Sequence, residues 1–118
     1  MEDLVMTAFN VIGAVGSAKS CVMESMVLAR EGKFEDARNK IKEANEMIKT
    51  GEEEHFKVIT KESKAIQEGD SVALNLLYIH AEDQLMTTVV LRDTALEMIE
   101  TNKMIYDLSK RIEVLESK

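Results

Sequence analysis

Two side chains with different chemistry lie one helical turn apart in the second half of the sequence, His80 and Asp83. An imidazole has an unprotonated ring nitrogen near neutral pH, so a histidine can act as a nucleophile toward phosphoryl groups. A carboxylate is the kind of oxygen ligand that hard divalent cations prefer. On a helix, residues three apart lie on the same side, about 60° from one another. The spacing allows phosphoryl chemistry at His80 beside a charged group, although a lone helical histidine is usually structural or simply exposed.

The other histidine, His55, and the only cysteine, Cys21, are weaker candidates. His55 falls on an apolar stripe and has no clustered acidic or thiol partner in the sequence pattern, so we interpret it as structural. A single cysteine cannot form an intramolecular disulfide, and we interpret Cys21 as a small buried thiol of a protein from a reducing compartment.

Polar breaks centred on glycine divide the chain into three helical segments. Gly32 and Gly69 each lie among charged residues, as helix ends and short connections do. No proline interrupts the chain, and apolar residues recur at spacings of three and four. Asp70 or Ser71 precedes the third segment and can cap it. The predicted helices cover about 3–30, 34–66 and 72–116.

Long helices with short connections imply one all-α domain over 1–118, an antiparallel up-down-up three-helix bundle. In the first helix, the expected core stripe is Val5, Ala8, Ile12, Val15, Val22, Met26 and Ala29, with Lys19 at the remaining position. In the second, it is Phe34, Ala37, Ile41, Ala44 and Ile48, continuing less regularly through Gly51, His55, Ile59 and Ile66. In the third, it is Leu74, Leu77, Ala81, Leu85, Thr88, Ala95 and Ile99.

The third predicted helix carries a second apolar stripe, with an aspartate in its middle. It comprises Leu76, Ile79, Asp83, Met86 and Val90, at spacings of 3, 4, 3 and 4. A three-helix monomer does not need this stripe, so copies of the chain could bury it against one another. Carboxylates of Asp83 would then converge, which is costly unless they are protonated or bridged by a cation. Alternatively, the stripe is shallow and Asp83 simply faces solvent.

The overall charge and composition bear on which partners and which location in the cell this protein has. A formal net charge of −7 disfavours nucleic acid and anionic membrane surfaces. We expect no apolar run to approach the roughly 18 residues of a membrane span. The acidic N-terminal stretch lacks the basic region of a secretory signal. We expect a soluble, cytoplasmic protein that binds no nucleic acid.

Three segments resemble one known protein family. The stretch from His80 to Thr88, His-Ala-Glu-Asp-Gln-Leu-Met-Thr-Thr, resembles the HxQDHLMT signature of the enzyme IIA components of the lactose/cellobiose class of the bacterial sugar phosphotransferase system. Gly16-Ser17-Ala18-Lys19-Ser20 is similar to the small-residue segment of this family that ends in Ala-Arg-Ser. Gly32-Lys33-Phe34-Glu35-Asp36-Ala37 is similar to its Gly-Asp-Phe-x-x-Ala. The likeness spans about residues 5–108.

The resemblance implies a trimer of three-helix subunits and a phosphotransferase role. The histidine matching His80 accepts a phosphoryl group from the histidine-containing phosphocarrier protein and passes it to a cysteine of the cognate enzyme IIB. The aspartate matching Asp83 binds a divalent cation at the trimer axis, and magnesium is the ion we expect there. Contact with the membrane would be indirect, through the permease, and the sugar is not readable from this chain.

Hydrogen bonds that stabilise a phosphoryl group on His80 must come from side chains, because backbone amides inside a helix are already paired. The candidate supporting residues are Glu82, Gln84, Lys19 and Thr87. Glu82 and Gln84 stand where the family has glutamine and histidine, and an ionised carboxylate repels a phosphoryl group that a glutamine could bind. Lys19 stands where the family has an arginine. A compact ammonium therefore replaces a planar guanidinium, which can make two parallel hydrogen bonds. The alternative function is a non-enzymatic helical interaction or regulatory module that uses the same helix face.

Overall fold

The computed structural model describes residues 2–73 and 75–118, which form three long helices. These are α1 (Glu2–Arg30), α2 (Phe34–Gln67) and α3 (Leu76–Glu116). No strand occurs among the described residues, so the all-helical prediction is confirmed. The molecule is a rod with extents of 75 × 23 × 19 Å.

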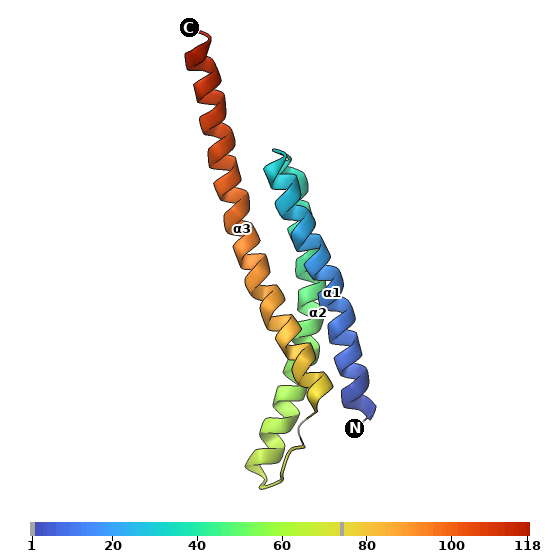
Figure 1. Ribbon diagram of the computed structural model, residues 1–118. Coiled ribbons are helices and arrows are strands. Elements are labelled where there is room, and N and C mark those ends of the chain that lie inside the picture. The colour runs from blue at the N-terminus through green and yellow to red at the C-terminus, as the bar shows by residue number, and fades with distance from the viewer. Residues whose placement is uncertain (1, 74) are drawn as a thin grey trace.

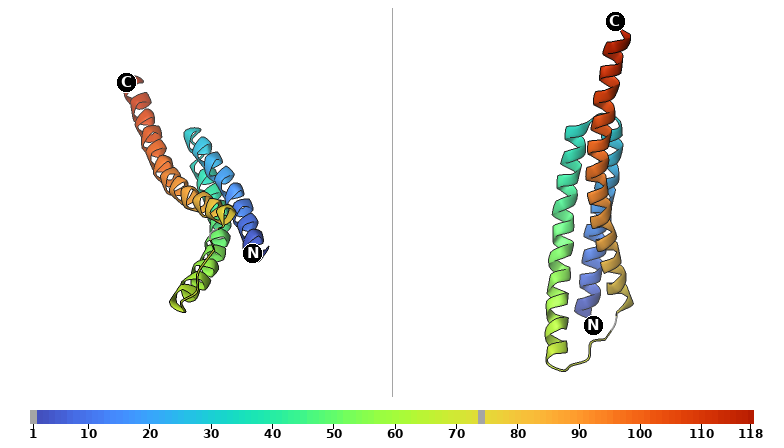
Figure 2. Two further views of the ribbon diagram at one scale, coloured as in Figure 1. Left: turned by 60° about the horizontal axis from the view of Figure 1, so that its bottom comes forward. Right: turned by 90° about the vertical axis from the view of Figure 1, so that its left-hand side faces the viewer.

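Each helix runs back along the one before it (Figure 1). α1 packs along both other helices, whereas α2 and α3 share a shorter contact. Two ends project beyond the common bundle (Figure 2): the C-terminal part of α2 and, at the opposite end, the C-terminal part of α3. The α1–α2 turn is tight because Gly32 adopts a φ of 82° and Lys33 N–H donates to Leu28 O at 2.9 Å.

The predicted bounds of the first two helices agree with the structure to within one residue, but α3 begins four residues later than predicted. The capping prediction is wrong. Asp70 and Ser71 lie in the connection, and Asn75 is the N-cap, its Oδ1 accepting the N–H of Tyr78 at 2.9 Å. A side-chain acceptor directly before the first helical turn satisfies a backbone donor that otherwise has no partner, which places the start of the helix at Leu76.

The buried stripe of α1 differs in phase from the prediction. It consists of Ala8, Val11, Val15, Ala18, Val22, Ser25 and Ala29. Val11 and Ala18 thus replace the predicted Ile12 and Lys19; Ile12 is half-buried and Lys19 is exposed. Ser25 is accommodated because its hydroxyl donates to Val22 O at 2.6 Å. Small residues at these positions allow the helices to approach closely, which the apolar pattern alone did not show.

The stripes of α2 and α3 agree better with the prediction. α2 buries Ala37, Ile41, Ala44, Ile48 and Gly51. Ile59 and Ile66 are exposed, contrary to prediction, because the last part of α2 projects past the bundle. α3 buries Tyr78, Ala81, Leu85, Thr88, Ala95 and Ile99, while the predicted Leu74 lies outside the described residues.

The expectation that no apolar segment reaches the length of a membrane span is wrong. α1 is long and apolar enough to span a membrane by length and composition, with a mean hydropathy of 1.4 in its most apolar window. The core helix of a soluble bundle passes the same test, and here one face of α1 is buried against α2 and α3.

Candidate functional site

The burial of one face of α3 determines where His80 and Asp83 lie. Tyr78, Ala81 and Leu85 are buried against the other helices. Because successive helical residues are about 100° apart, this packing turns His80 and Asp83 away from the bundle. Both side chains are exposed.

The second apolar stripe of α3 is not used in packing the chain. Leu76 is 81% exposed and Val90 64%, and Ile79 and Met86 are also exposed. Asp83 lies among them and is exposed too. The chain therefore presents an apolar face with one carboxylate in its centre, on the side of α3 opposite to the core.

No contact among the described residues brings the predicted supporting residues together around His80. These residues are Glu82, Gln84, Lys19 and Thr87. The hydroxyl of Thr87 donates to backbone oxygens of its own helix, at 2.8 Å to Asp83 O and 3.2 Å to Gln84 O. Gln84 is half-buried, and Lys19 lies exposed on α1.

Glu82 faces α2, where it forms a polar cluster with His55 and Tyr78. His55 Nδ1 lies 2.9 Å from Glu82 Oε1 and 3.1 Å from the Tyr78 hydroxyl oxygen. The Glu82 carboxylate is also near enough to the Tyr78 hydroxyl to raise its pKa. A carboxylate only accepts, so Nδ1 of His55 carries the proton that it donates to Glu82. The expectation that His55 has no acidic partner is therefore wrong.

This cluster changes the electrostatics next to His80. The Glu82 carboxylate accepts a hydrogen bond from His55 on α2, which partly offsets its negative charge. In turn, burial and the Glu82 carboxylate raise the pKa of Tyr78 well above its usual range. Sequence reasoning missed the cluster, although Tyr78 and Glu82 are four residues apart and so share one helix face.

A metal ion would need ligands from more than one chain. Among the described residues, no three histidine, cysteine or acidic side chains come together as a metal site. Asp83 offers one exposed carboxylate with the oxygen chemistry that hard divalent cations take. One chain therefore supplies a single ligand, which fits a cation only where equivalent carboxylates converge.

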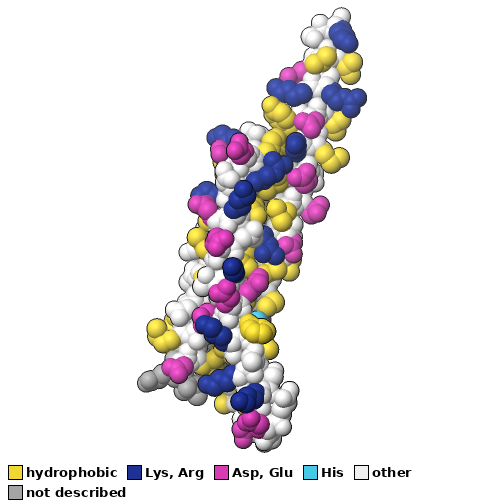
Figure 3. Space-filling model, turned by 180° about the vertical axis from the view of Figure 1, so that it is seen from behind, with side chains coloured by type: hydrophobic (Ala, Val, Ile, Leu, Met, Phe, Trp, Pro, Cys, Tyr) yellow, Lys and Arg dark blue, Asp and Glu magenta, His cyan; other side chains and the backbone are white. Residues whose placement is uncertain are grey.

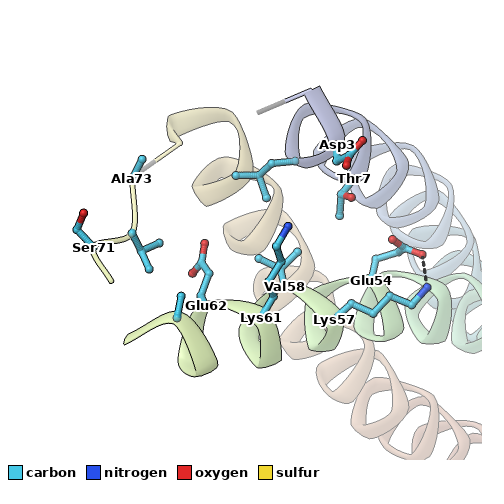
Figure 4. A pocket seen from close by; sticks show the side chains of 12 residues that line it. Asp3, Thr7, Glu54, Lys57, Val58, Lys61, Glu62, Ser71 and Ala73 are labelled. Carbon is cyan, nitrogen blue, oxygen red and sulfur yellow. Dashed lines mark hydrogen bonds and ion pairs between the residues drawn. The ribbon is translucent and has the colours of Figure 1, made fainter. Parts of the chain in front are cut away.

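One cavity lies away from His80, between the start of α1, the second half of α2 and the α2–α3 connection (Figure 4). Its volume is about 430 Å³. Its charged lining consists of Asp3, Glu54, Lys57, Lys61 and Glu62. Lys57 is paired with Glu54 at 3.3 Å. The mixed charges do not select an anion, and His80 does not line it, so we do not assign the phosphoryl site there.

Comparison with known proteins matches most of this chain to one family. The family model described as "PTS system, Lactose/Cellobiose specific IIA subunit" matches residues 6–103. The oligo-beta-mannoside-specific EIIA component of Bacillus subtilis is 34% identical over 96 residues, covering 81% of this chain and 84% of that protein. The lactose-specific EIIA component of Staphylococcus epidermidis is 28% identical over 102 residues, covering 86% and 94%.

Solved structures show the same fold. The crystal structure of the PTS cellobiose-specific enzyme IIA from Bacillus anthracis aligns with a TM-score of 0.76 at 26% identity, covering 86% of this chain and 90% of that chain. The structure of PtcA from S. mutans aligns with a TM-score of 0.78 at 31% identity, covering 87% and 97%. With three long helices in common and a match over most of its length, this chain belongs to the lactose/cellobiose-specific IIA family of the phosphotransferase system.

Proposed function

We propose that this chain accepts a phosphoryl group on His80 from the histidine-containing phosphocarrier protein and passes it to a cysteine of a cognate enzyme IIB. The uptake served would be of lactose/cellobiose-type sugars. The observation that carries the proposal is the exposure of His80 on the outer face of α3. The family signature begins at the same residue, and a partner can approach the ring without any movement of the bundle.

The chemistry needs little from the chain beyond positioning. A ring nitrogen of His80 attacks phosphorus in line, and the P–N bond to the donor imidazole breaks as the P–N bond to His80 forms. In the second transfer, the P–N bond at His80 breaks as a P–S bond to the cysteine thiolate of enzyme IIB forms.

The side chains near His80 differ in what they could offer the phosphoryl group. Gln84, one turn along the helix, has amide donors. Thr87 already donates its proton to the backbone, and Glu82 is held on the α2 side by His55. We therefore assign Gln84 the main supporting role and give Lys19, Thr87 and Glu82 lesser ones.

We further propose that three copies assemble through the exposed apolar face of α3. Asp83 carboxylates from the copies would then meet at the axis, where a divalent cation, magnesium being the expected ion, offsets their repulsion. The chain would work in the cytoplasm and reach the membrane only through the permease.

The test is phosphoryl labelling by the general phosphotransferase proteins and labelled phosphoenolpyruvate. Wild type should take up an acid-labile label, His80→Ala none, and the matched control His55→Gln should retain it. Equal, acid-stable labelling of all three would overturn the proposal.

A second candidate function, a non-enzymatic interaction module, is favoured by the exposed Leu76 and Ile79. It predicts that Leu76→Lys abolishes partner binding while His80→Ala leaves sugar uptake unchanged.

A further inference from the structure

Two carboxylates lie within three residues of the proposed phosphoacceptor, and both would repel a phosphoryl group on His80. Asp83 is exposed on the same outward side of α3 as His80, and the cation proposed above would offset its charge. Glu82 is the second carboxylate, two residues after His80, and it faces α2, away from that cation. The charge of Glu82 therefore needs a partner of its own.

No lysine or arginine of α3 lies close to Glu82 along the helix. The first such residue is Arg92, ten positions after Glu82 and so about 15 Å farther along. Its guanidinium already contacts Asp93 at 3.1 Å and Asn45 at 3.3 Å. On the face drawn in Figure 3, basic and acidic side chains are interleaved along the molecule. With a formal net charge of −7 as well, no general positive field offsets a carboxylate beside His80, and a local contact must do so.

His55 of α2 provides this local contact. Its Nδ1 donates to Glu82 Oε1 at 2.9 Å, and the same nitrogen lies 3.1 Å from the hydroxyl oxygen of Tyr78. The side chains of His55 and Glu82 are 22% and 31% exposed, so water screens the contact only in part. A hydrogen bond to an ionised carboxylate is stronger than one between neutral groups. His55 therefore holds Glu82 and also lowers its effective charge.

The hydrogen bond determines on which side of α3 the Glu82 carboxylate lies. Residues two positions apart leave a helix about 200° from one another, although their Cα atoms are only about 5.4 Å apart. While His55 holds it, the carboxylate stays on the α2 side. A glutamate has three rotatable side-chain bonds, so a released Glu82 carboxylate is free to turn outward, to within roughly 9 Å of a phosphoryl group on His80. Repulsion at that range disfavours phosphorylation by about threefold to tenfold.

We propose that His55 is a positioning residue for the phosphoryl chemistry, which binds the Glu82 carboxylate on the α2 side of α3 and so keeps its charge away from the phosphoryl group on His80. His55 itself does not touch that group. This inference rests on the proposed function at His80. It accounts for an acidic residue two positions from a phosphoacceptor, where a neutral amide would need no such partner.

The test measures the equilibrium constant for phosphoryl transfer from the histidine-containing phosphocarrier protein to the full-length chain, with magnesium present. Phosphorylated and free forms of both proteins are quantified after the reaction has come to equilibrium. This constant depends on the free energy of the phosphorylated chain and not on how fast the two proteins dock. A variant that is merely slower in docking therefore leaves the constant unchanged, and circular dichroism verifies that each variant is folded.

His55→Leu should lower the equilibrium constant about threefold to tenfold, because leucine has no donor for Glu82. The matched control is His55→Asn, whose amide nitrogen stands close to the position of Nδ1, and it should stay within about twofold of wild type. His55→Leu/Glu82→Gln should return to the wild-type constant, because no carboxylate is left to turn outward. An unchanged constant in His55→Leu, or an equal loss in the double variant, overturns the proposal.

Glu82→Gln alone provides a test that does not depend on the folding of His55→Leu. It should change the constant by less than about twofold, because His55 already keeps the charge away, and a larger rise overturns the proposal.

Salt provides a further test of the electrostatic cause. In 1 M salt, where the screening length is about 3 Å, the loss in His55→Leu relative to wild type should disappear. A loss that persists overturns the proposal. Absence of label on His80 in wild type would remove the proposed function itself, whereas a labelled wild type with an unchanged His55→Leu removes only this inference.

Discussion

His55 on α2 and Glu82 on α3 form a hydrogen bond of 2.9 Å between Nδ1 and Oε1, two residues along α3 from the proposed phosphoacceptor. The pair and Tyr78 join two helices that otherwise share the smallest contact in the bundle. Arg38 with Glu100 at 3.3 Å and Arg92 with Asn45 at 3.3 Å are more exposed links between the same helices. The His55–Glu82 cluster therefore holds the first turns of α3, including His80, against α2.

A double-mutant cycle with His55→Gln and Glu82→Gln should show a coupling of about 0.5–1.5 kcal/mol in the free energy of unfolding. The two side chains are only 22% and 31% exposed, so water screens the pair weakly. The measurement is urea unfolding. Lys57 and Glu54, paired at 3.3 Å with the lysine 71% exposed, serve as the control and should couple by less than about 0.5 kcal/mol, because water screens the exposed ammonium. Coupling no larger than that of the control would contradict the prediction.

Ionisation of Tyr78 should lower the free energy of unfolding only in alkaline solution. Its pKa is raised by burial and by the Glu82 carboxylate, so the folded chain holds the phenol proton after the unfolded chain has lost it. The unfolded state then binds fewer protons, and stability falls as pH rises above about 10, the usual tyrosine value. In Tyr106→Phe, where Tyr78 is the only tyrosine, phenolate absorbance should appear together with the loss of helical circular dichroism. Ionisation well before unfolding would contradict this.

A larger side chain in place of Gly51 should destabilise the fold, because all three helices meet at this position. A Cβ at this position would lie 3.2 Å from Leu85 Cδ1 and 3.3 Å from Val15 Cγ2. Gly51→Val should destabilise the chain by about 1–3 kcal/mol through overpacking. Gly13→Ala is the control, since a Cβ there meets nothing within 4 Å, and it should stabilise by about 0.5–1 kcal/mol through helix propensity. Chemical unfolding measures the change in the free energy of unfolding for both variants. Similar changes in the two would refute the packing argument.

Asp83 should make assembly depend on divalent cations. We expect chelation to weaken the wild-type oligomer, because the converging carboxylates then repel one another. Asp83→Leu should assemble equally well with and without chelator, because it removes the charge and adds apolar surface to the α3 face. Sedimentation equilibrium with magnesium and with chelator is the measurement. A wild-type mass that does not respond to chelator would count against a cation at Asp83.

Much of this protein is determined by local sequence. Glycines at Gly32 and Gly69, with positive φ at both, end the first two helices where the pattern predicts. The placement of His80 and Asp83 on one outward face follows from helical periodicity alone, since that angle depends only on the number of residues between them. The exposed stripe from Leu76 to Val90 was predicted for the same reason, and the structure leaves it uncovered within the chain.

The tertiary structure decided what periodicity cannot. Which of two adjacent stripes of α1 is buried depended on how closely Val11 and Ala18 let the neighbouring helices approach. The start of α3 depended on Asn75 capping Tyr78, in a stretch whose apolar residues fit either start. The partner of Glu82 depended on the relative alignment of α2 and α3, which the α2–α3 connection and the packing against α1 set together. A contact between residues 27 positions apart has no periodic signal, because it arises only when separate helices dock.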